Sequence, residues 1–530
     1  MGSSIGNVNA GMVPPPARDG YPWATLFWAA WTLTLGAHVV LAMTLSPFGD
    51  EAWYWQESRA LDISFSDIPP ATALLINLGE KLFGHGVFGM RSLFIVLGAL
   101  IPIVMMRMSR RLFGETNGWM CGLLALALPL LGIAGVLALP DVPLTFFTAI
   151  ALDQLERASR TNKISAWVAL GIALAGAWLS HYRAAMLLVA GFCFFLTMRG
   201  RVQWRKPGLW IALGISCIGL FPLVLFNMQH DWVALHFQTV ERNPWTFHGD
   251  AIAQPIEQAI VCTPVFYALM MWAAWQCLRR VKRGAPWGPL AICAAVPLVL
   301  YFVLGFFADD TRFRVHWPIP GYLPLLIALP MLIREHIQRR WFRWFATCSF
   351  VSLAIGLVCI YAYLGAATSP PLAQRLASVK AFPEHVVGWN EASNRTRELA
   401  ANLPPDTVIV ADNFMLAAEL DFAFDGTRTV YSLDHPINTK HGRAPQLAMW
   451  KRDEAGLREL GKRNVLLIAE PTARRERERA DWMQSLCSRI DDLQPVASLD
   501  PFGGRKKYRW FSGTISVTQP AVSACQATMP

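Results

Sequence analysis

Long apolar runs separated by short polar segments fill the first two thirds of the chain. A membrane-spanning helix needs roughly 20 mainly apolar residues, and about eleven stretches before residue 365 meet that requirement. They begin near Tyr21, Val87, Leu112, Val142, Ser165, Ala184, Pro207, Ala259, Trp287, Pro318 and Trp344. The pattern predicts a polytopic α-helical membrane protein with about eleven transmembrane helices.

Lys and Arg gather in every second loop, and this asymmetry predicts the orientation. Cytoplasmic loops collect these residues, and here they follow the second, fourth, sixth, eighth and tenth stretches, for example at 107–111 and 279–283. An odd number of spans then places the C-terminus outside. Residues 1–20 are polar and expected to be disordered, and they lack the apolar core and cleavage site of a secretory signal. We therefore expect the first span to be retained.

The external loop of residues 50–88 is too long for a plain turn. Its aromatic, weakly apolar pieces at Trp53–Leu61 and Leu74–Phe83 suit helices that lie in the membrane interface. We expect this loop to form a lid-like rim at the external face.

After about residue 365 the composition turns polar, and strand-like runs alternate with helical patterns. The strand-like runs are Thr407–Val410 and Asn464–Ile468, and the helical patterns are Asn394–Asn402 and Thr472–Gln484. Residues 366–511 are expected to form a small external α/β domain after the membrane domain of residues 21–365. Residues 512–530 are expected to be a tail without assigned structure.

The composition excludes several functional classes. Hydrophobic residues make up 54% of the 530 positions and charged residues 16%, which is too apolar for an ordinary soluble protein. The sequence contains no Gly-rich nucleotide loop before a helix, no His-Glu-x-x-His run and no nucleophile elbow. It therefore does not support the use of a soluble nucleotide sugar, and no nucleic-acid partner is expected. Cys487 and Cys525 alone lie in the polar C-terminal part, where one disulfide fits an exported domain.

Acidic residues occur where apolar stretches reach the external face. Asp50 and Glu51 follow the first stretch, where a carboxylate can stay ionised and still face a lipid-borne substrate. The alternative is that both residues cap the next helix through its dipole. Asp141 lies in a Pro-rich turn between the third and fourth stretches, and ordinary turn formation is its alternative explanation.

Cations and polar aromatic segments occupy the other external turns. His181 and Arg183 suit an anionic head group, although Arg183 also has the length to snorkel at the interface. Asn227 and His230 belong to a segment suited either to sugar binding or to an ordinary surface loop. The segment 309–316 combines phosphate-binding cations with acids, and salt bridges among its own side chains are the alternative.

Taken in order, these motifs resemble a known family. The chain is similar to lipid-dependent glycosyltransferases of the GT-C superfamily, in the protein O-mannosyltransferase-like branch, with bacterial aminoarabinose and galacturonic acid lipid A or core transferases as close comparisons. The resemblance rests on 50–55, 67–70, 83–84 with Arg91, 140–143, 180–183, 227–232 and 316–318, and more weakly on 411–420 and 442–450. It implies a GT-C fold.

The resemblance also assigns roles to single residues. It implies that Asp50 is the catalytic carboxylate and that Asp141 is a second acidic group near the site. Relatives commonly have His or Lys where this chain has Ile68, and often Lys where it has His181. The leaving phosphate is therefore expected to be bound by Arg183, with help from His181 and Arg314. Expected substrate contacts are Glu51, Tyr54, Asp67, Asn227 and His230.

The implied enzyme is a polyprenyl-phosphate-sugar-dependent hexosyl- or pentosyltransferase of the bacterial inner membrane, with its C-terminal domain in the periplasm. The acceptor would be lipid A, lipopolysaccharide or another glycan. Asp50 would take the proton of a hydroxyl acceptor, and Arg183 would stabilise the charge that grows on the leaving phosphate. No tightly bound cofactor is expected. Some relatives hold a metal near this rim, and Asp67 and His316 are candidate ligands for a divalent metal here.

Three other functions use the same features. A flippase or transporter of an isoprenoid-linked or other anionic lipid would use the charged rim only for recognition. The charged groups cluster at one face, without a matched polar set near the midplane, which favours an enzyme over this alternative. A protein O-glycosyltransferase would pass the sugar to a protein instead. An acceptor-binding or scaffold protein, whose site-like loops no longer act in catalysis, is compatible with Ile68 at a position where relatives commonly have His or Lys.

Overall fold

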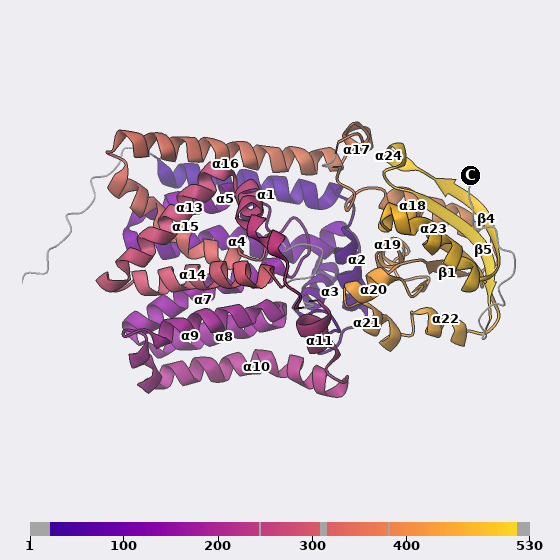
Figure 1. Cartoon of the computed structure of the whole chain (residues 1–530), viewed down its shortest axis with the longest axis horizontal. Helices are drawn as coiled ribbons and strands as arrows, with labels where there is room; N and C mark the ends of the chain where they lie inside the picture. Colours follow the sequence, from indigo (N-terminus) through magenta and orange to yellow (C-terminus); the bar gives the residue numbers. More distant parts are fainter. Residues whose placement is uncertain (1–21, 243–244, 308–314, 380–381, 517–530) are drawn as a thin grey trace, which may run out of the picture.

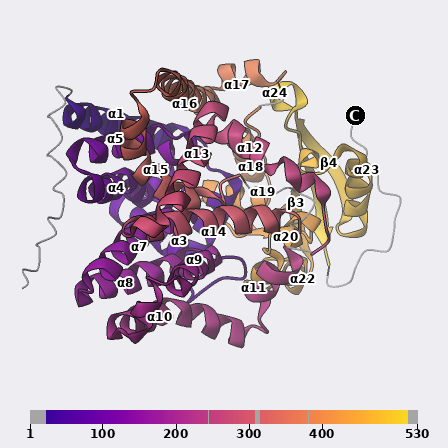
Figure 2. The ribbon, with the colours of Figure 1, turned by 60° about the vertical axis from the view of Figure 1, so that its left-hand side comes forward.

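The computed structural model of the chain describes residues 22–242, 245–307, 315–379 and 382–516. A bundle of long helices from the first two thirds of the chain occupies one end of the long axis, and a smaller unit that contains a β-sheet occupies the other (Figure 1). Turning the molecule by 60° keeps the helix bundle and this C-terminal unit side by side (Figure 2).

Five helices within the described ranges are long and apolar enough to cross a membrane: α1 (Trp23–Thr44), α4 (Val87–Phe113), α10 (Pro207–Gln229), α14 (Trp287–Gly305) and α16 (Arg340–Ala367). A sixth results if the pair Gly249–Cys262 and Pro264–Arg283, bent by 113°, is one broken span. Other predicted spans coincide with α5 (Glu115–Ala127), α7 (Asp141–Thr161), α8 (Ile164–Ser180), α9 (Ala185–Leu196) and α15 (Ile319–His336). The chain is a multi-pass membrane protein, and the count of about eleven spans stays a prediction.

Helix α15 lies inside the bundle because it has no polar face along most of its length. Every residue from Ile319 to Pro330 is buried, as expected for a helix that is apolar all round. Close backbone contact holds the neighbouring segment in place. A Cβ on Gly98 of α4 would lie 1.9 Å from the carbonyl oxygen of Ala134. Glycine at this position therefore lets α4 support the segment that leads into Asp141.

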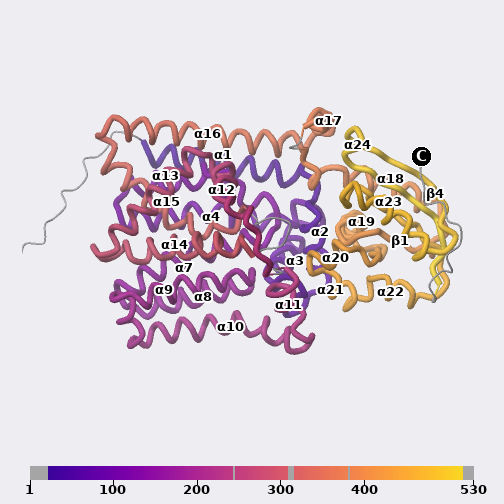
Figure 3. Tube along the Cα trace, in the orientation of Figure 1, coloured from indigo at the N-terminus to yellow at the C-terminus, as the bar shows by residue number. Residues whose placement is uncertain are grey.

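Helices α2 (Gly49–Arg59) and α3 (Ala71–Phe83) confirm the two helical pieces predicted within the 50–88 loop. Their environment differs from that of a lid in the membrane interface, because α2 packs against α19 (Phe414–Ala423) of the C-terminal unit (Figure 3). Trp53 and Trp55 are fully buried. The aromatic side chains that suggested the interface instead fill a dry contact between the two parts of the protein.

The C-terminal unit is built on a mixed five-stranded sheet of order β2-β1-β3-β5-β4. Strands β1 (Val408–Ala411), β2 (Val430–Ser432) and β3 (Arg463–Ala469) are parallel, and β5 (Tyr508–Ile515) is antiparallel to β3 and to β4 (Asp491–Leu499). β1 and β3 confirm the predicted strands, and α18 (Trp389–Ala401) and α23 (Glu476–Ser485) confirm the predicted helices. Helices α20 (Pro436–Lys440), α21 (Ala444–Met449) and α22 (Glu454–Glu459) connect β2 to β3.

Strand β5 corrects the predicted start of the tail. The strand continues through Ser512 to Ile515, with Ser512 opposite Leu466 and Gly513 opposite Val465 of β3. Backbone pairing with β3 extends the strand where its own side chains give no strand signal, because strand formation depends strongly on neighbouring strands. Cys487 forms a disulfide, and its predicted partner Cys525 lies outside the described residues.

Candidate functional site

Arg443 of the C-terminal unit is the centre of a charged cluster at the junction with the helix bundle. Its Nη2 lies 3.2 Å from Oδ1 of Asp50 and 3.3 Å from the hydroxyl oxygen of Tyr54. Its Nη1 forms an ion pair with Asp67. Because Asp50 and Tyr54 belong to α2 and Arg443 precedes α21, the site is built from both parts of the protein.

Burial divides the members of this cluster into two groups. Arg443 is 3% exposed and Asp67 is 2% exposed, whereas the Asp50 side chain retains 17% of its surface. The guanidinium of Arg443 lies over the rings of Trp53 and Phe414, at 5.1 and 5.5 Å from the centroids. Asp50 is therefore the carboxylate of the cluster that an incoming molecule reaches most easily.

Two further ionisable groups on α2 are neutral at pH 7. Burial raises the pKa of Tyr54 to about 12 and that of Glu57 to about 8. Nε1 of Trp53 donates a hydrogen bond to Oε1 of Glu57 at 2.9 Å. Arg443 therefore faces the carboxyl groups of Asp50 and Asp67 beside two neutral groups.

Glu51 lies next to Asp50 in the sequence but has a different environment. It is fully buried, and its Oε1 accepts hydrogen bonds from Nε of Arg91 at 2.8 Å and from the backbone N–H of Ala138 at 2.6 Å. Its Oε2 accepts from Nη2 of Arg91 and from the backbone N–H of Phe48, at 2.6 and 2.9 Å. Protein donors occupy both oxygens, an arrangement that favours a structural role over the predicted contact with substrate.

Asp141 and Arg183 form the second charged cluster. Asp141 begins α7, and Arg183 lies in the short turn between α8 and α9, where its Nη2 pairs with Asp141. Nε2 of His316 lies 3.6 Å from the same Asp141 oxygen. The backbone N–H of Arg183 donates to Nδ1 of His181 at 3.0 Å. Burial and then the Arg183 guanidinium hold the pKa of His181 well below its usual range, so this imidazole is neutral.

Arg242 and Gln238 connect the two clusters. Nη1 of Arg242 donates to Oε1 of Gln238 at 3.1 Å, and Nε2 of Gln238 donates to the backbone oxygen of Asp67 at 2.7 Å. The guanidinium groups of Arg242 and Arg183 lie 5.2 and 5.7 Å from the ring centroid of Trp317. Two arginines thus approach one aromatic ring at the end of the bundle that meets the C-terminal unit.

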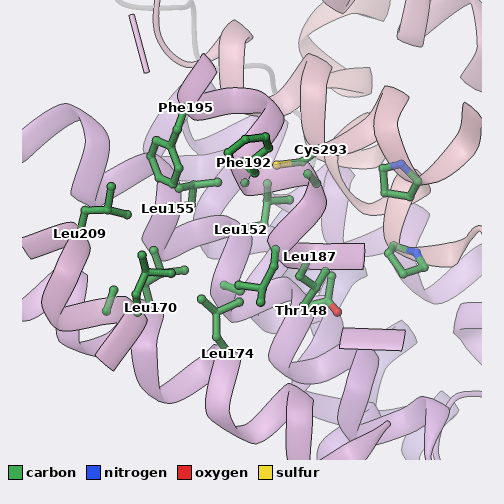
Figure 4. A pocket seen from close by; sticks show the side chains of 18 of the residues that line it. Thr148, Leu152, Leu155, Leu170, Leu174, Leu187, Phe192, Phe195, Leu209 and Cys293 are labelled. Carbon is green, nitrogen blue, oxygen red and sulfur yellow. The ribbon is translucent and has the colours of Figure 1, made fainter. Parts of the chain in front are cut away.

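Two cavities lie close to the Arg183 cluster. The first, of about 420 Å³, has Arg183, Arg242 and His181 in its lining together with apolar residues of α8 and α10. The second, of about 250 Å³, is almost entirely apolar and lies among α7, α8, α9 and α10 (Figure 4). Thr148 and Leu152 of α7 line it. Because α7 begins at Asp141, the second cavity starts roughly 10 Å along the helix from the charged cluster.

Asn227 and His230 use polar atoms to hold their own loop. Nδ2 of Asn227 donates to the backbone oxygen of Leu223 at 2.7 Å, and its Oδ1 accepts from the backbone N–H of Leu235 at 2.8 Å. The ring of His230 stacks on Phe226 with centroids 4.3 Å apart. Asn227 nevertheless belongs to the lining of the larger cavity. The contacts of Asn227 and His230 with substrate stay predictions.

The predicted metal ligands do not fit a metal site. Asp67 pairs with Arg443, whose positive charge opposes a divalent cation, whereas His316 belongs to the Asp141 cluster. No group of three or more His, Cys, Asp or Glu side chains suited to a metal occurs in the part of the chain that the structure describes. Arg314, the predicted helper of Arg183, lies outside that part.

Comparison with known proteins shows which proteins the chain resembles. A family model described as dolichyl-phosphate-mannose-protein mannosyltransferase matches residues 67–226, the segment that contains Asp141, His181 and Arg183. Lipid A galacturonosyltransferase RgtD of Rhizobium johnstonii is 24% identical over 393 residues, which cover 73% of this chain and 79% of that protein. The chain is therefore similar to glycosyltransferases of the PMT_2 family over residues 67–226 and to RgtD over 73% of its length.

Other similar proteins extend the likeness beyond the segment that the family model matches. The undecaprenyl phosphate-α-4-amino-4-deoxy-L-arabinose arabinosyl transferase 2 of Pseudomonas fluorescens is 22% identical, with 62% of this chain and 64% of that protein covered. The crystal structure of ArnT from Cupriavidus metallidurans bound to undecaprenyl phosphate matches with a TM-score of 0.65 at 15% identity, covering 94% of this chain and 98% of the other. The two proteins therefore share a fold through both the helix bundle and the C-terminal unit.

Sequence reasoning missed the contributions of Arg443 and Arg242. Gly442-Arg443 was part of the weaker resemblance, but no local pattern indicates that its guanidinium reaches Asp50, 393 positions away. Arg242 follows the polar segment of residues 227–232, and its only signal in the sequence is a basic residue on the predicted external side, where basic residues are uncommon.

Proposed function

We propose that this protein transfers a sugar from a polyprenyl-phosphate carrier to lipid A, lipopolysaccharide or another glycan at the external face of the bacterial inner membrane. The observation that carries the proposal is the Arg183 cluster beside an apolar cavity. Cationic side chains suit a phosphate, and an apolar cavity suits part of an isoprenoid chain. RgtD acts on lipid A, and the ArnT structure holds undecaprenyl phosphate, which supports these classes of acceptor and donor.

Arg183 is proposed to stabilise the leaving phosphate. The phosphate gains negative charge as the glycosidic bond breaks, so a fixed guanidinium binds the transition state more tightly than the ground state. Arg183 is partly buried and oriented by His181, Trp317 and Asp141. Asp141, the second acidic group, would then position Arg183 and yield part of this contact to the phosphate. Arg242, which also lies close to the ring of Trp317, is a second candidate for the phosphate.

Asp50 is proposed to be the general base for a hydroxyl acceptor. Its partial exposure supports this role, and Arg443 holds the carboxylate in place through the contact at 3.2 Å. If the acceptor is itself a phosphate, no proton is removed, and Asp50 orients the acceptor instead. Tyr54 contacts the same Nη2 of Arg443, and Asp67 holds Nη1.

The proposed topology has about eleven transmembrane helices in a GT-C arrangement, with the C-terminal unit in the periplasm. The disulfide of Cys487 supports this location, because disulfides persist mainly in oxidising compartments. Attachment of a membrane-impermeant maleimide to an engineered cysteine at exposed Lys451, in intact spheroplasts, tests the location. Labelling only after lysis would place the C-terminal unit in the cytoplasm and refute the topology.

A reconstituted transfer assay tests the reaction. Purified protein in proteoliposomes would be incubated with polyprenyl-phosphate sugars and lipid A, and released polyprenyl phosphate would be measured by mass spectrometry. Asp50→Asn is expected to abolish transfer, whereas Asp62→Asn, an exposed carboxylate of the same loop, is expected to leave it unchanged. Arg183→Ala is expected to lower kcat about 100-fold or more.

Four results would contradict parts of this proposal. Equal transfer by wild type and Asp50→Asn would remove the role of Asp50. A normal kcat for Arg183→Ala, with only weaker donor binding, would remove the role of Arg183 in the transition state. Movement of the carrier across the membrane without any transfer would favour the flippase, and transfer only to a protein would favour the protein O-glycosyltransferase.

A further inference from the structure

A polar cavity of about 590 Å³ lies at the end of the helix bundle that faces away from the C-terminal unit. The C-terminal end of α13 (Pro264–Arg280), the C-terminal end of α15 and the start of α16 surround it. The same helices run along the bundle toward the C-terminal unit at their other ends (Figure 1). The cavity therefore opens on the face that the distribution of Lys and Arg predicts to be cytoplasmic.

The lining of this cavity is basic and aromatic. It includes Arg279, Arg280, Arg283 and Arg339, and none of the described residues that line it is Asp or Glu. The guanidinium of Arg279 lies over the ring of Trp275 at 4.5 Å from the centroid. Trp275 is 51% exposed, so an indole stands beside the arginines where the bundle meets the membrane surface, the depth that tryptophan prefers.

Arg280 presents an unsatisfied donor at this cavity. The residue is 6% exposed, and its Nη2 pairs with Glu335 at 2.5 Å. Its Nη1 is buried and has no hydrogen-bond partner among the described residues. A buried guanidinium N–H without an acceptor is unfavourable. Arg280 also adds a positive charge to the lining of the cavity.

Three arginines of this cavity differ from Arg111 and Arg160 on the same face. Arg111 pairs with Asp153 and Glu156, and Arg160 also pairs with Glu156. In contrast, no acidic side chain in the described part of the chain pairs with Arg279, Arg283 or Arg339. A loop that served only to orient the protein in the membrane would need basic residues but not a shaped cavity with a buried donor.

We propose that this cavity binds the phosphate headgroup of an anionic phospholipid from the leaflet opposite the C-terminal unit. Arginine recognises phosphate through paired, charge-assisted hydrogen bonds, and basic pockets between transmembrane helices on the cytoplasmic side suit lipids with more than one phosphate. The exposed Trp275 would contact the glycerol and upper acyl region. The site is separate from the proposed transfer reaction, and its test does not depend on that reaction.

Native mass spectrometry of the detergent-solubilised full-length protein tests the proposal with three probes: cardiolipin, phosphatidylethanolamine and inorganic phosphate. One cardiolipin is expected to bind at least tenfold more tightly than phosphatidylethanolamine, and inorganic phosphate is expected to compete poorly. The variant Arg279→Ala/Arg283→Ala/Arg339→Ala is expected to weaken cardiolipin binding at least tenfold. The control Arg107→Ala/Arg201→Ala/Arg205→Ala removes the same charge from exposed positions outside the cavity and is expected to bind as the wild type does.

Equal losses in the two triple variants would mean that general charge on this face explains binding, and they would overturn the proposal. Equal binding of cardiolipin and phosphatidylethanolamine would also overturn it. Displacement of the lipid by equimolar inorganic phosphate would mean that the cavity binds a free anion and not a lipid headgroup, and this result would also overturn the proposal. If the triple variant does not fold, the single variant Arg339→Ala takes its place, because Arg339 lies at an exposed position before α16. This variant is expected to lower the affinity for cardiolipin severalfold, and an unchanged affinity would overturn the proposal.

Discussion

Replacing Arg443 with Met tests whether one buried cation joins the two parts of the protein. The substitution keeps most of the side-chain volume against Trp53 and Phe414 but removes the charge. Asp67 would then be a carboxylate at 2% exposure without its counter-ion. Asp50, which is more exposed, would regain contact with water.

The expected loss is large because Asp67 cannot reach water. Removing one partner of a buried ion pair costs about 3–5 kcal/mol, whereas an exposed pair contributes about 0–1 kcal/mol. For a folded unit of 150–250 residues, each kcal/mol lowers the melting temperature by roughly 2–4 °C. Arg443→Met is therefore expected to lower the melting temperature by about 6–20 °C.

Intrinsic tryptophan fluorescence in detergent would follow thermal unfolding. The matched control is Lys451→Ala, which removes an ion pair with Glu459 in the same unit. The two side chains are 71% and 59% exposed, so this variant is expected to change the melting temperature by less than about 4 °C. Asp67→Asn/Arg443→Met is expected to recover part of the loss, because neighbouring substitutions are not additive. A drop as small as that of the control, or no recovery in the double variant, would refute the role of the buried pair.

Three other substitutions address separate features. Glu51→Gln is expected to lower the stability of the protein by about 3–5 kcal/mol, because it leaves Arg91 without a counter-ion. The folded fraction is expected to keep its transfer rate. A stable variant without transfer would restore the predicted contact between Glu51 and substrate. Burial raises the pKa of Asp412 to about 7, so the folded state binds more protons than the unfolded state and stability falls as pH rises from about 4 to 7, by roughly 4 kcal/mol. In thermal melts across this range, Asp412→Asn is expected to flatten that dependence, and an unchanged slope would exclude Asp412 as its source. Gly98→Ala is expected to destabilise the protein by about 1–3 kcal/mol, because the new Cβ would meet the Ala134 carbonyl oxygen. The control Gly36→Ala, whose Cβ would have no heavy atom within 4 Å, is expected to leave the stability unchanged. Equal melting temperatures for both variants would contradict this reasoning.

The order of elements could be predicted from the sequence because the signals are local. A long apolar run identifies α4 or α16 without knowledge of any neighbour, and period and turn residues identified β1 and β3 in the same way. Asp50, Asp141 and Arg183 could be selected because each follows or precedes an apolar stretch at a predicted external turn. These predictions depend only on where the chain enters and leaves the membrane, so they need no contact between distant residues.

The tertiary structure decided which of these side chains act together. Asp50 and Glu51 are adjacent in sequence, yet successive residues of a helix point in different directions, so Asp50 meets Arg443 while Glu51 enters a buried pair with Arg91. The aromatic residues of α2 were expected at the membrane interface, but the C-terminal unit covers them. The sequence by itself determined where helices and charges occur along the chain. Only packing between α2 and a unit almost 400 residues away determined which charges are buried, because burial and ion pairing depend on contacts that no local pattern encodes.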